Sequence, residues 1–139
     1  MRSFLALILM LTFVGAARAQ EAAPDSKMVA AMKIIGANFK AIGMQSSDPT
    51  AFAALVPKVQ ELRAQVLSIV GETPAELAKS VPAEQLPLAR LGYEKLMLTL
   101  AAQSVDLEAA LRKGSAADVE TALDAMSDTK SDGHDQFKP

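Results

Sequence analysis

Apolar residues recur every three or four positions along most of the chain, and this period predicts amphipathic α-helices. In the first such segment the apolar positions follow steps of four, three, four and three: Met28, Met32, Ile35, Phe39 and Ile42. Asp25 or Ser26 would cap this helix, and Gly43 would end it. The pattern predicts one apolar stripe that faces a core.

The second helix is predicted from Asp48 and Pro49 to about Val70. Aspartate accepts hydrogen bonds from free amides, and proline at the first helical position lacks an amide that would go unused. The apolar stripe of this helix is Phe52, Leu55, Val59, Leu62, Val66 and Ile69. Because Pro57 lies within the stripe, we expect a kink or a late start there.

Three prolines between Glu72 and Pro87 indicate a connection with room for one helical turn. The third helix is predicted from about Leu86 to Lys113, and Gly114 would end it. Its inner face is Leu86, Tyr93, Met97, Leu100, Leu107 and Leu111.

The last helix is predicted from Ser115 to about Phe137, with Ser115 and Asp118 spaced as in a capping box. Its inner face is Val119, Leu123, Met126, Lys130, Gly133 or His134, and Phe137. No segment alternates with the period of a strand. The sequence therefore predicts an all-α protein, with an up-down-up-down antiparallel four-helix bundle as its architecture.

The N-terminal residues predict export. Arg2, an apolar run from Phe4 to Val14 and the small residues up to Ala19 have the layout of a secretory signal, which we expect to be cleaved after Ala19. The run is well short of the roughly 20 residues that a membrane-spanning helix needs. We therefore expect a signal peptide over residues 1–19, a bundle domain over residues 20–139, a periplasmic location and no membrane span in the mature protein.

Composition narrows the possible chemistry. The chain has no cysteine, which excludes disulfides, thiolate metal sites, iron–sulfur clusters and covalent c-type haem attachment. The leader contains two of the 14 basic residues and none of the 16 acidic ones, so its removal leaves a formal charge of −4. An acidic chain with one tyrosine and no tryptophan lacks a nucleic-acid footprint, and a basic or cationic partner suits it better.

The only histidine, His134, lies in the last helix. In the predicted topology the first helix starts at the end of the bundle where the last helix finishes. Met32 would then lie about 9 Å inside the first helix and His134 roughly 7–8 Å from the end of the last. We expect both side chains to face inward at similar depth, where a thioether and an imidazole could hold a haem iron from two sides. A methionine on a helical stripe is also commonly core filler, and a lone histidine near a terminus is commonly solvated, so both interpretations stay open.

Four short motifs resemble one family. The stretch from Met32 to Ile42 resembles the first helix of the cytochrome b562 family of soluble periplasmic b-type cytochromes, where a methionine ligand precedes an Asn-hydrophobic-Lys triplet. Leu62-Arg63-Ala64 with Thr73-Pro74 is similar to the family's second helix and its exit. Arg90-Leu91-Gly92-Tyr93 is similar to an Arg-x-Gly-aromatic stretch of its third helix. Gly114 precedes His134 by twenty residues, as the family's last glycine precedes its ligand. Their order and spacing cover nearly all of residues 26–138.

The resemblance implies one non-covalent haem b between helices, with Met32 and His134 as axial ligands and Phe39 and Tyr93 near the haem face. It implies periplasmic electron transfer with an unidentified redox partner, and no enzyme activity. Cytochromes c′ share the bundle but attach haem through Cys-x-x-Cys-His, whereas Lys130 and Gly133 occupy the cysteine positions here. Met28, one turn before Met32, is an alternative ligand.

Two other functions fit the sequence. Four methionines could form a soft site for Cu(I), which would make this a periplasmic copper-binding protein: Met28, Met32, Met97 and Met126. A haem-free helical bundle that acts by protein interaction is the second. One histidine, no cysteine and no convergent set of carboxylates argue against an enzyme.

Overall fold

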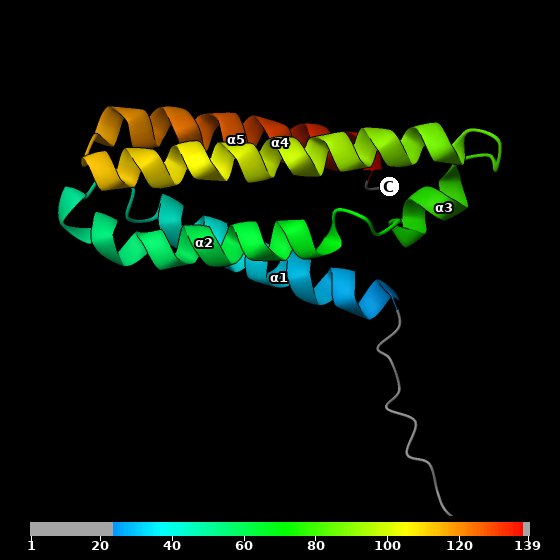
Figure 1. The fold of residues 1–139 in the computed structure, drawn as a ribbon, viewed down its shortest axis with the longest axis horizontal. Coiled ribbons are helices and arrows are strands. Elements are labelled where there is room, and N and C mark those ends of the chain that lie inside the picture. The colour runs from blue at the N-terminus through cyan, green and yellow to red at the C-terminus, as the bar shows by residue number, and fades with distance from the viewer. Residues whose placement is uncertain (1–23, 138–139) are drawn as a thin grey trace, which may run out of the picture.

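The computed structural model of the protein describes residues 24–137, and every regular element in that range is a helix (Figure 1). In chain order the elements are α1 (Pro24–Gly43), a 3-10 turn (Pro49–Ala51), α2 (Phe52–Ile69), α3 (Ala75–Ser80), α4 (Leu86–Lys113) and α5 (Ala116–Phe137). The predicted all-α class is confirmed. The predicted signal peptide, residues 1–19, lies outside the described residues.

The boundary between α4 and α5 follows from Gly114, the one described residue with a positive φ, at 74°. The Gly114 amide donates to the Leu111 carbonyl at 3.1 Å and the Ser115 amide to the Ala110 carbonyl at 3.3 Å, which together close the end of α4. The Ser115 hydroxyl then accepts from the Asp118 amide at 3.2 Å. Only this arm of the predicted capping box forms, because the Ser115 amide already has a partner.

The start predicted for the first helix is wrong, whereas the start predicted for the second is confirmed. Helix α1 already includes Pro24, one or two residues before the expected caps Asp25 and Ser26. The second helical segment does begin at Pro49, where the Asp48 carboxylate accepts from the Thr50 hydroxyl at 2.6 Å and from the Thr50 amide at 2.9 Å. These two hydrogen bonds, the one from the hydroxyl first, lower the pKa of Asp48. Helix α2 then runs without interruption through Pro57, so a late start there is excluded.

The four long helices lie side by side (Figure 1). Helix α1 packs on α2, α2 on α4 and α4 on α5, whereas α1 and α5 do not form a closely packed pair within residues 24–137. The short α3 follows α2 at the end where α4 begins. The start of α1 and the end of α5 lie toward the same end of the molecule (Figure 1).

Burial follows this packing. All six stripe residues predicted in α2 are buried, because α2 has packed neighbours on two sides. In α1 the buried residues are Ala31, Asn38 and Ile42, while the rest of the predicted stripe is at most half-buried and Met32 is 40% exposed. In α5 the predicted inner residues Lys130 and His134 are exposed. These last departures share one cause, which is that the facing sides of α1 and α5 border a cavity instead of another helix.

None of the helices in the described range 24–137 has the length and apolar character needed to span a lipid bilayer.

Candidate functional site

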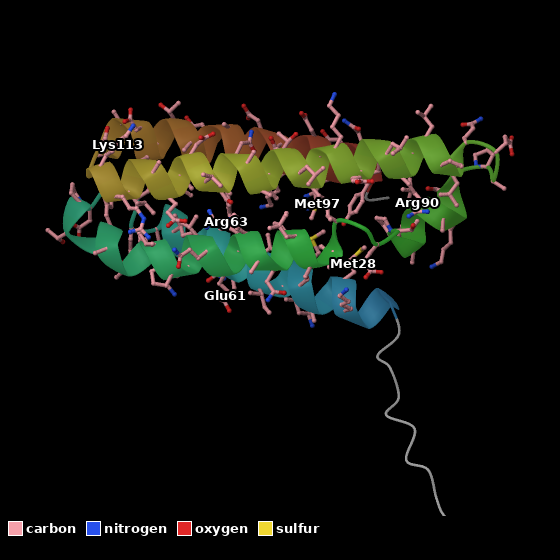
Figure 2. All side chains as sticks on the ribbon, viewed as in Figure 1. Met28, Glu61, Arg63, Arg90, Met97 and Lys113 are labelled. Atoms are coloured by element: carbon pink, nitrogen blue, oxygen red, sulfur yellow. The ribbon has the colours of Figure 1, made fainter. Side chains whose placement is uncertain are left out.

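A cavity of about 390 Å³ opens between α1, α4 and α5, with one side chain of α2 at its floor. Its size is within the range of roughly 300–1,000 Å³ that small-molecule sites occupy. The lining is mostly apolar: Met28, Met32, Ile35, Gly36, Phe39, Leu62, Pro74, Tyr93, Leu96, Met97, Leu100, Lys130, Gly133, His134 and Phe137. In Figure 2 the labelled Met28 and Met97 side chains extend from α1 and α4 in the half of the molecule where α5 ends.

The structure brings all four site residues named from the sequence to this one cavity. Met32 and Phe39 come from α1, Tyr93 from α4 and His134 from α5. Met32 and His134 are about a hundred positions apart in the chain, and they line one cavity because α1 begins at the end of the molecule where α5 finishes (Figure 1). The cavity therefore has a thioether on one wall and an imidazole on another.

The burial of these residues differs from the expectation that Met32 and His134 both point inward. Met32 is 40% exposed and His134 is exposed, whereas Tyr93 is only 4% exposed and Phe39 is half-buried. Met32 and His134 thus lie at the solvent edge of the cavity, and the aromatic side chains lie deeper. A ligand held by Met32 and His134 would keep one edge near solvent.

Tyr93 lines the cavity and carries a buried polar atom. Its hydroxyl is buried and has no hydrogen-bond partner among the described residues. Burial, and second the Glu72 carboxylate, raise the pKa of Tyr93 to about 12, so the phenol stays protonated and can donate. A buried donor without a partner is uncommon, and an acceptor on a bound ligand would satisfy it.

Side-chain contacts across the edges of the cavity connect its walls. The Lys130 ammonium lies 5.4 Å from the centre of the Phe39 ring, so a cation–π contact joins α5 to α1. The Phe137 ring packs edge-on against Tyr93, with the ring centres 5.7 Å apart. At the same end, Lys27 bonds Glu72 at 2.8 Å and ties the start of α1 to the segment after α2.

Sequence reasoning did not identify Gly36, Pro74 or Leu96 as cavity residues. Leu96 lies outside the predicted stripe of α4, and Pro74 was interpreted only as part of a connection. One signal was available for Leu96, because it lies one turn before Leu100 and three residues after Tyr93. The sequence held no such signal for Gly36, because a glycine has no side chain and contributes to a cavity only by leaving space.

The four methionines proposed for Cu(I) do not all meet. Met28, Met32 and Met97 line the cavity, but Met126 is fully buried in the core and does not reach it. Within residues 24–137 there is also no group of three or more histidine or carboxylate side chains that could hold a metal ion. Any metal in this cavity would depend on thioether and imidazole ligands.

Comparisons of this chain with protein-family models, with curated proteins and with solved structures find no match.

Proposed function

We propose that this protein is a periplasmic electron carrier that binds one haem b non-covalently within an up-down-up-down antiparallel four-helix bundle, with Met32 and His134 as axial ligands. The observation that carries the proposal is the convergence of Met32 and His134, from opposite ends of the chain, on one largely apolar cavity. The motif resemblance to the cytochrome b562 family selects the same two residues. The proposed bundle is open between α1 and α5, which is where a flat ligand would enter.

The residues that line the cavity fit a haem group. A thioether and an imidazole are the ligand pair that raises the reduction potential of haem iron, and the bound iron would supply the change of oxidation state. Met32 would hold the iron from α1, and His134 would hold it from α5. Apolar side chains at the floor, such as Leu62 and Leu100, would keep water away from the buried face.

Two polar groups would orient the haem. The Tyr93 hydroxyl is a donor that needs an acceptor, and the Lys130 ammonium places a positive charge near the cavity edge, where carboxylates would be stabilised. The exposed positions of Met32 and His134 would leave the haem edge accessible to a redox partner. Electron transfer requires no proton donor or nucleophile, which suits a cavity without a histidine–carboxylate pair, so we do not propose enzyme activity.

The visible absorption spectrum of the protein purified from the exported fraction tests this function. Sharp alpha and beta bands on reduction are expected for low-spin haem with two axial ligands. A colourless protein that also fails to bind added haemin would reject haem binding. Recovery of the full-length precursor from the cytoplasm alone would reject the proposed location without affecting the cofactor.

A copper-binding function is the second candidate, because three thioethers and one imidazole line the same cavity. It predicts stoichiometric Cu(I) binding in the absence of haem, with loss of binding in a Met28→Leu, Met32→Leu variant. The buried Met126 gives the control, since Met126→Leu should leave copper binding unchanged. If haemin displaces Cu(I) from the cavity, both metals use this site and their affinities decide between them.

A further inference from the structure

The cavity between α1, α4 and α5 carries charge of one sign only. Among the described residues that line it, Lys130 is the single lysine, and none is an arginine, aspartate or glutamate. The rest of the lining is apolar apart from Tyr93 and His134. A cleft with apolar walls and one sign of charge focuses its electric field and attracts molecules of the opposite sign. A molecule with an anionic group is therefore favoured here over a neutral molecule of the same shape.

Lys130 makes no ion pair within residues 24–137. The residues three and four positions away on α5, which lie on the same face, have no carboxylate: Met126, Ser127, Gly133 and His134. Asp128 and Asp132 are two positions away, and side chains at this spacing do not face each other. Helix α5 therefore leaves the positive charge of Lys130 available to a bound molecule.

The opposite wall does not neutralise this charge either. From residue 27 to residue 43, α1 contains three lysines and no aspartate or glutamate. The group on α1 that meets the Lys130 ammonium is the Phe39 ring, whose centre is 5.4 Å away. A cation and an aromatic face attract each other within about 6 Å, but only weakly where the cation is exposed, as Lys130 is. A hydrogen bond between two charged groups is stronger.

We propose that the cavity selects apolar molecules that carry a carboxylate or sulfonate, and that Lys130 makes the selection by exchanging its contact with Phe39 for an ion pair with the bound molecule. A neutral analogue would leave Lys130 on the Phe39 ring. The inference rests on the proposed use of this cavity as a binding site. It does not require that the bound molecule is haem, which is one member of the class because it has carboxylates.

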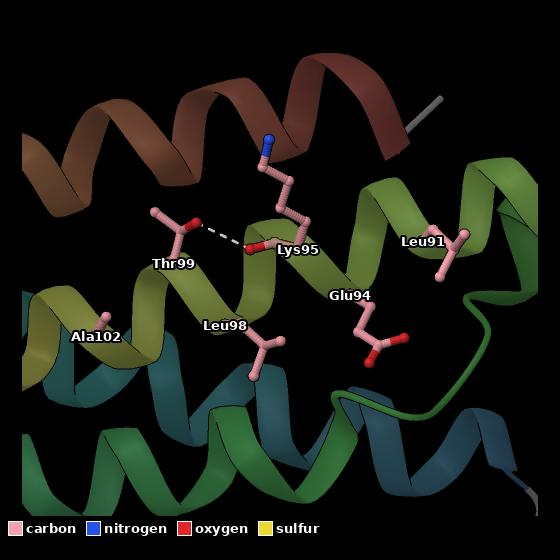
Figure 3. Close-up of a pocket in the computed structure, with 6 residues that line it drawn as sticks. All are labelled: Leu91, Glu94, Lys95, Leu98, Thr99 and Ala102. Atoms are coloured by element: carbon pink, nitrogen blue, oxygen red, sulfur yellow. Dashed lines mark hydrogen bonds between the residues drawn. The ribbon is translucent and has the colours of Figure 1, made fainter.

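A second hollow, on the outer face of α4, provides an internal comparison. It is shallow and is lined by Leu91, Glu94, Lys95, Leu98, Thr99 and Ala102. Figure 3 shows the Lys95 and Glu94 side chains extending from α4 at this hollow. Because a glutamate accompanies the lysine, this hollow should not favour anions as the cavity does. Lys95 is the matched control for Lys130, since both lysines are exposed and only Lys130 lines the cavity.

The test uses two fluorescent dyes that share one aromatic frame. Anilinonaphthalene sulfonate is an anion, and phenylnaphthylamine is the same frame without the sulfonate. Each dye is titrated into the purified full protein without added haemin, and the ratio of the two affinities is the readout. The wild type should bind both dyes and the sulfonate more tightly. Lys130→Gln should lower the sulfonate affinity by about fivefold and leave the neutral dye unchanged, whereas Lys95→Gln should change neither.

Phe39→Leu tests the exchange itself. Loss of the ring frees Lys130 from its present contact, so the ratio of sulfonate to neutral affinity should rise by about twofold to fivefold. Taking the ratio cancels the packing that both dyes lose with the ring. In the Lys130→Gln background the same Phe39→Leu change should leave the ratio unaltered, because there is no ammonium to release.

Three outcomes would overturn the proposal. The ratio could stay at its wild-type value in Lys130→Gln. It could fall instead in Lys95→Gln or His134→Gln, which would assign the selection to another residue. Neither dye could bind, which would show that the cavity does not admit apolar molecules. Haemin is titrated separately: the expected dye ratios without haemin binding would reject haem and keep this inference, and haemin binding with an unchanged ratio would do the reverse.

Discussion

Gly133 of α5 lies so close to Leu96 of α4 that a Cβ atom on Gly133 would be 2.9 Å from the Leu96 Cδ2 atom. Real Cβ atoms essentially never come this close, so a side chain here would force a movement. Gly133 directly precedes His134. The glycine therefore determines how closely the turn that carries the imidazole approaches α4.

Replacing Gly133 with alanine is expected to turn Leu96 into the cavity that it lines. Alanine favours the helix by about 1 kcal/mol over glycine, which offsets the contact, so the free energy of unfolding should change by less than about 1 kcal/mol. The affinity for haemin should fall, because Leu96 then occupies part of the site. Urea unfolding and haemin titration measure the two effects separately.

Adding Leu96→Ala to this variant should restore haemin affinity, since the crowded side chain is removed. An affinity of the Gly133→Ala variant equal to that of the wild type would show that the close approach of α5 and α4 has no role in the site.

Haem binding should depend unequally on the two proposed ligands. His134→Ala is expected to abolish stable haem binding, because imidazole binds iron in both oxidation states. Met32→Ala should leave a complex that is weaker by about tenfold or more, with an altered spin state and a lower potential, because the thioether favours reduced iron. Absorption spectra and redox titration of the purified variants measure these changes.

Met44 provides the matched control for Met32. It is 75% exposed and does not line the cavity, so Met44→Ala should leave the spectrum and the potential unchanged. If Met32→Ala also leaves both unchanged, Met28 becomes the candidate ligand, since it lies one turn away on the same wall.

The sequence predicted the long helices and the placement of Met32 and His134 at one end of the molecule, because both depend on local signals. Apolar period, Asp48–Pro49 and Gly114 define where helices begin and end, and the lengths of the long helices set which of their ends coincide. Because Met32 lies within three turns of the start of α1 at Pro24 and His134 within one turn of the end of α5 at Phe137, chain arithmetic places both toward the same end of the molecule. These features need no knowledge of how side chains pack.

What the sequence could not predict depends on spacing between helices. The apolar stripes of α1 and α5 have the same period, which predicts that both stripes are buried. Met32 and His134 are nevertheless exposed, because α1 and α5 do not pack closely on each other. The role of Gly133 beside Leu96, and the lack of a partner for the Tyr93 hydroxyl, likewise depend on distances between α4, α5 and the cavity. Apolar period alone does not separate a core face from a face that borders a cavity.

Tyr93 should make the folded protein less stable at alkaline pH. Its pKa is about 12 in the fold against an ordinary value of 10.0, so the folded state favours the neutral phenol. Above pH 10 the unfolded chain loses the proton first, and stability should fall as the pH rises from about 10 to about 12. Tyr93→Phe should remove this part of the pH dependence.

The measurement is direct because Tyr93 is the only tyrosine and the chain has no tryptophan. Phenolate absorbance of the folded protein should titrate at higher pH than that of the urea-unfolded protein. At pH 7 the Tyr93→Phe protein without ligand should be at least as stable as the wild type, by up to about 1 kcal/mol, since a buried donor without a partner is removed. A clear loss of stability would indicate that the hydroxyl is satisfied within the protein.

Glu108 should control stability in acid. Its carboxylate accepts from Arg112 of the same helix at 2.7 Å, from Arg63 at 2.7 Å and from Gln60 at 2.9 Å, and the bonds from Arg63 and Gln60 join α4 to α2. The hydrogen bonds from Arg112, Arg63 and Gln60 lower the pKa of Glu108 from 4.5 to about 2. The side chain is 14% exposed, so solvent screens the pairs only in part.

Because the folded pKa lies below the ordinary value, the stabilisation is complete above pH 4.5 and is lost as the pH falls toward about 2. Glu108→Gln should lower the free energy of unfolding by about 1 kcal/mol at pH 7 and much less near pH 2, so the two proteins should converge in acid. Urea unfolding at several pH values measures this, with the exposed Glu84→Gln as the control. The free energies of unfolding of Glu108→Gln and wild type could instead differ by the same amount from pH 7 to pH 2. That result would mean that the shape of Glu108, and not its charge, matters at the α2–α4 contact.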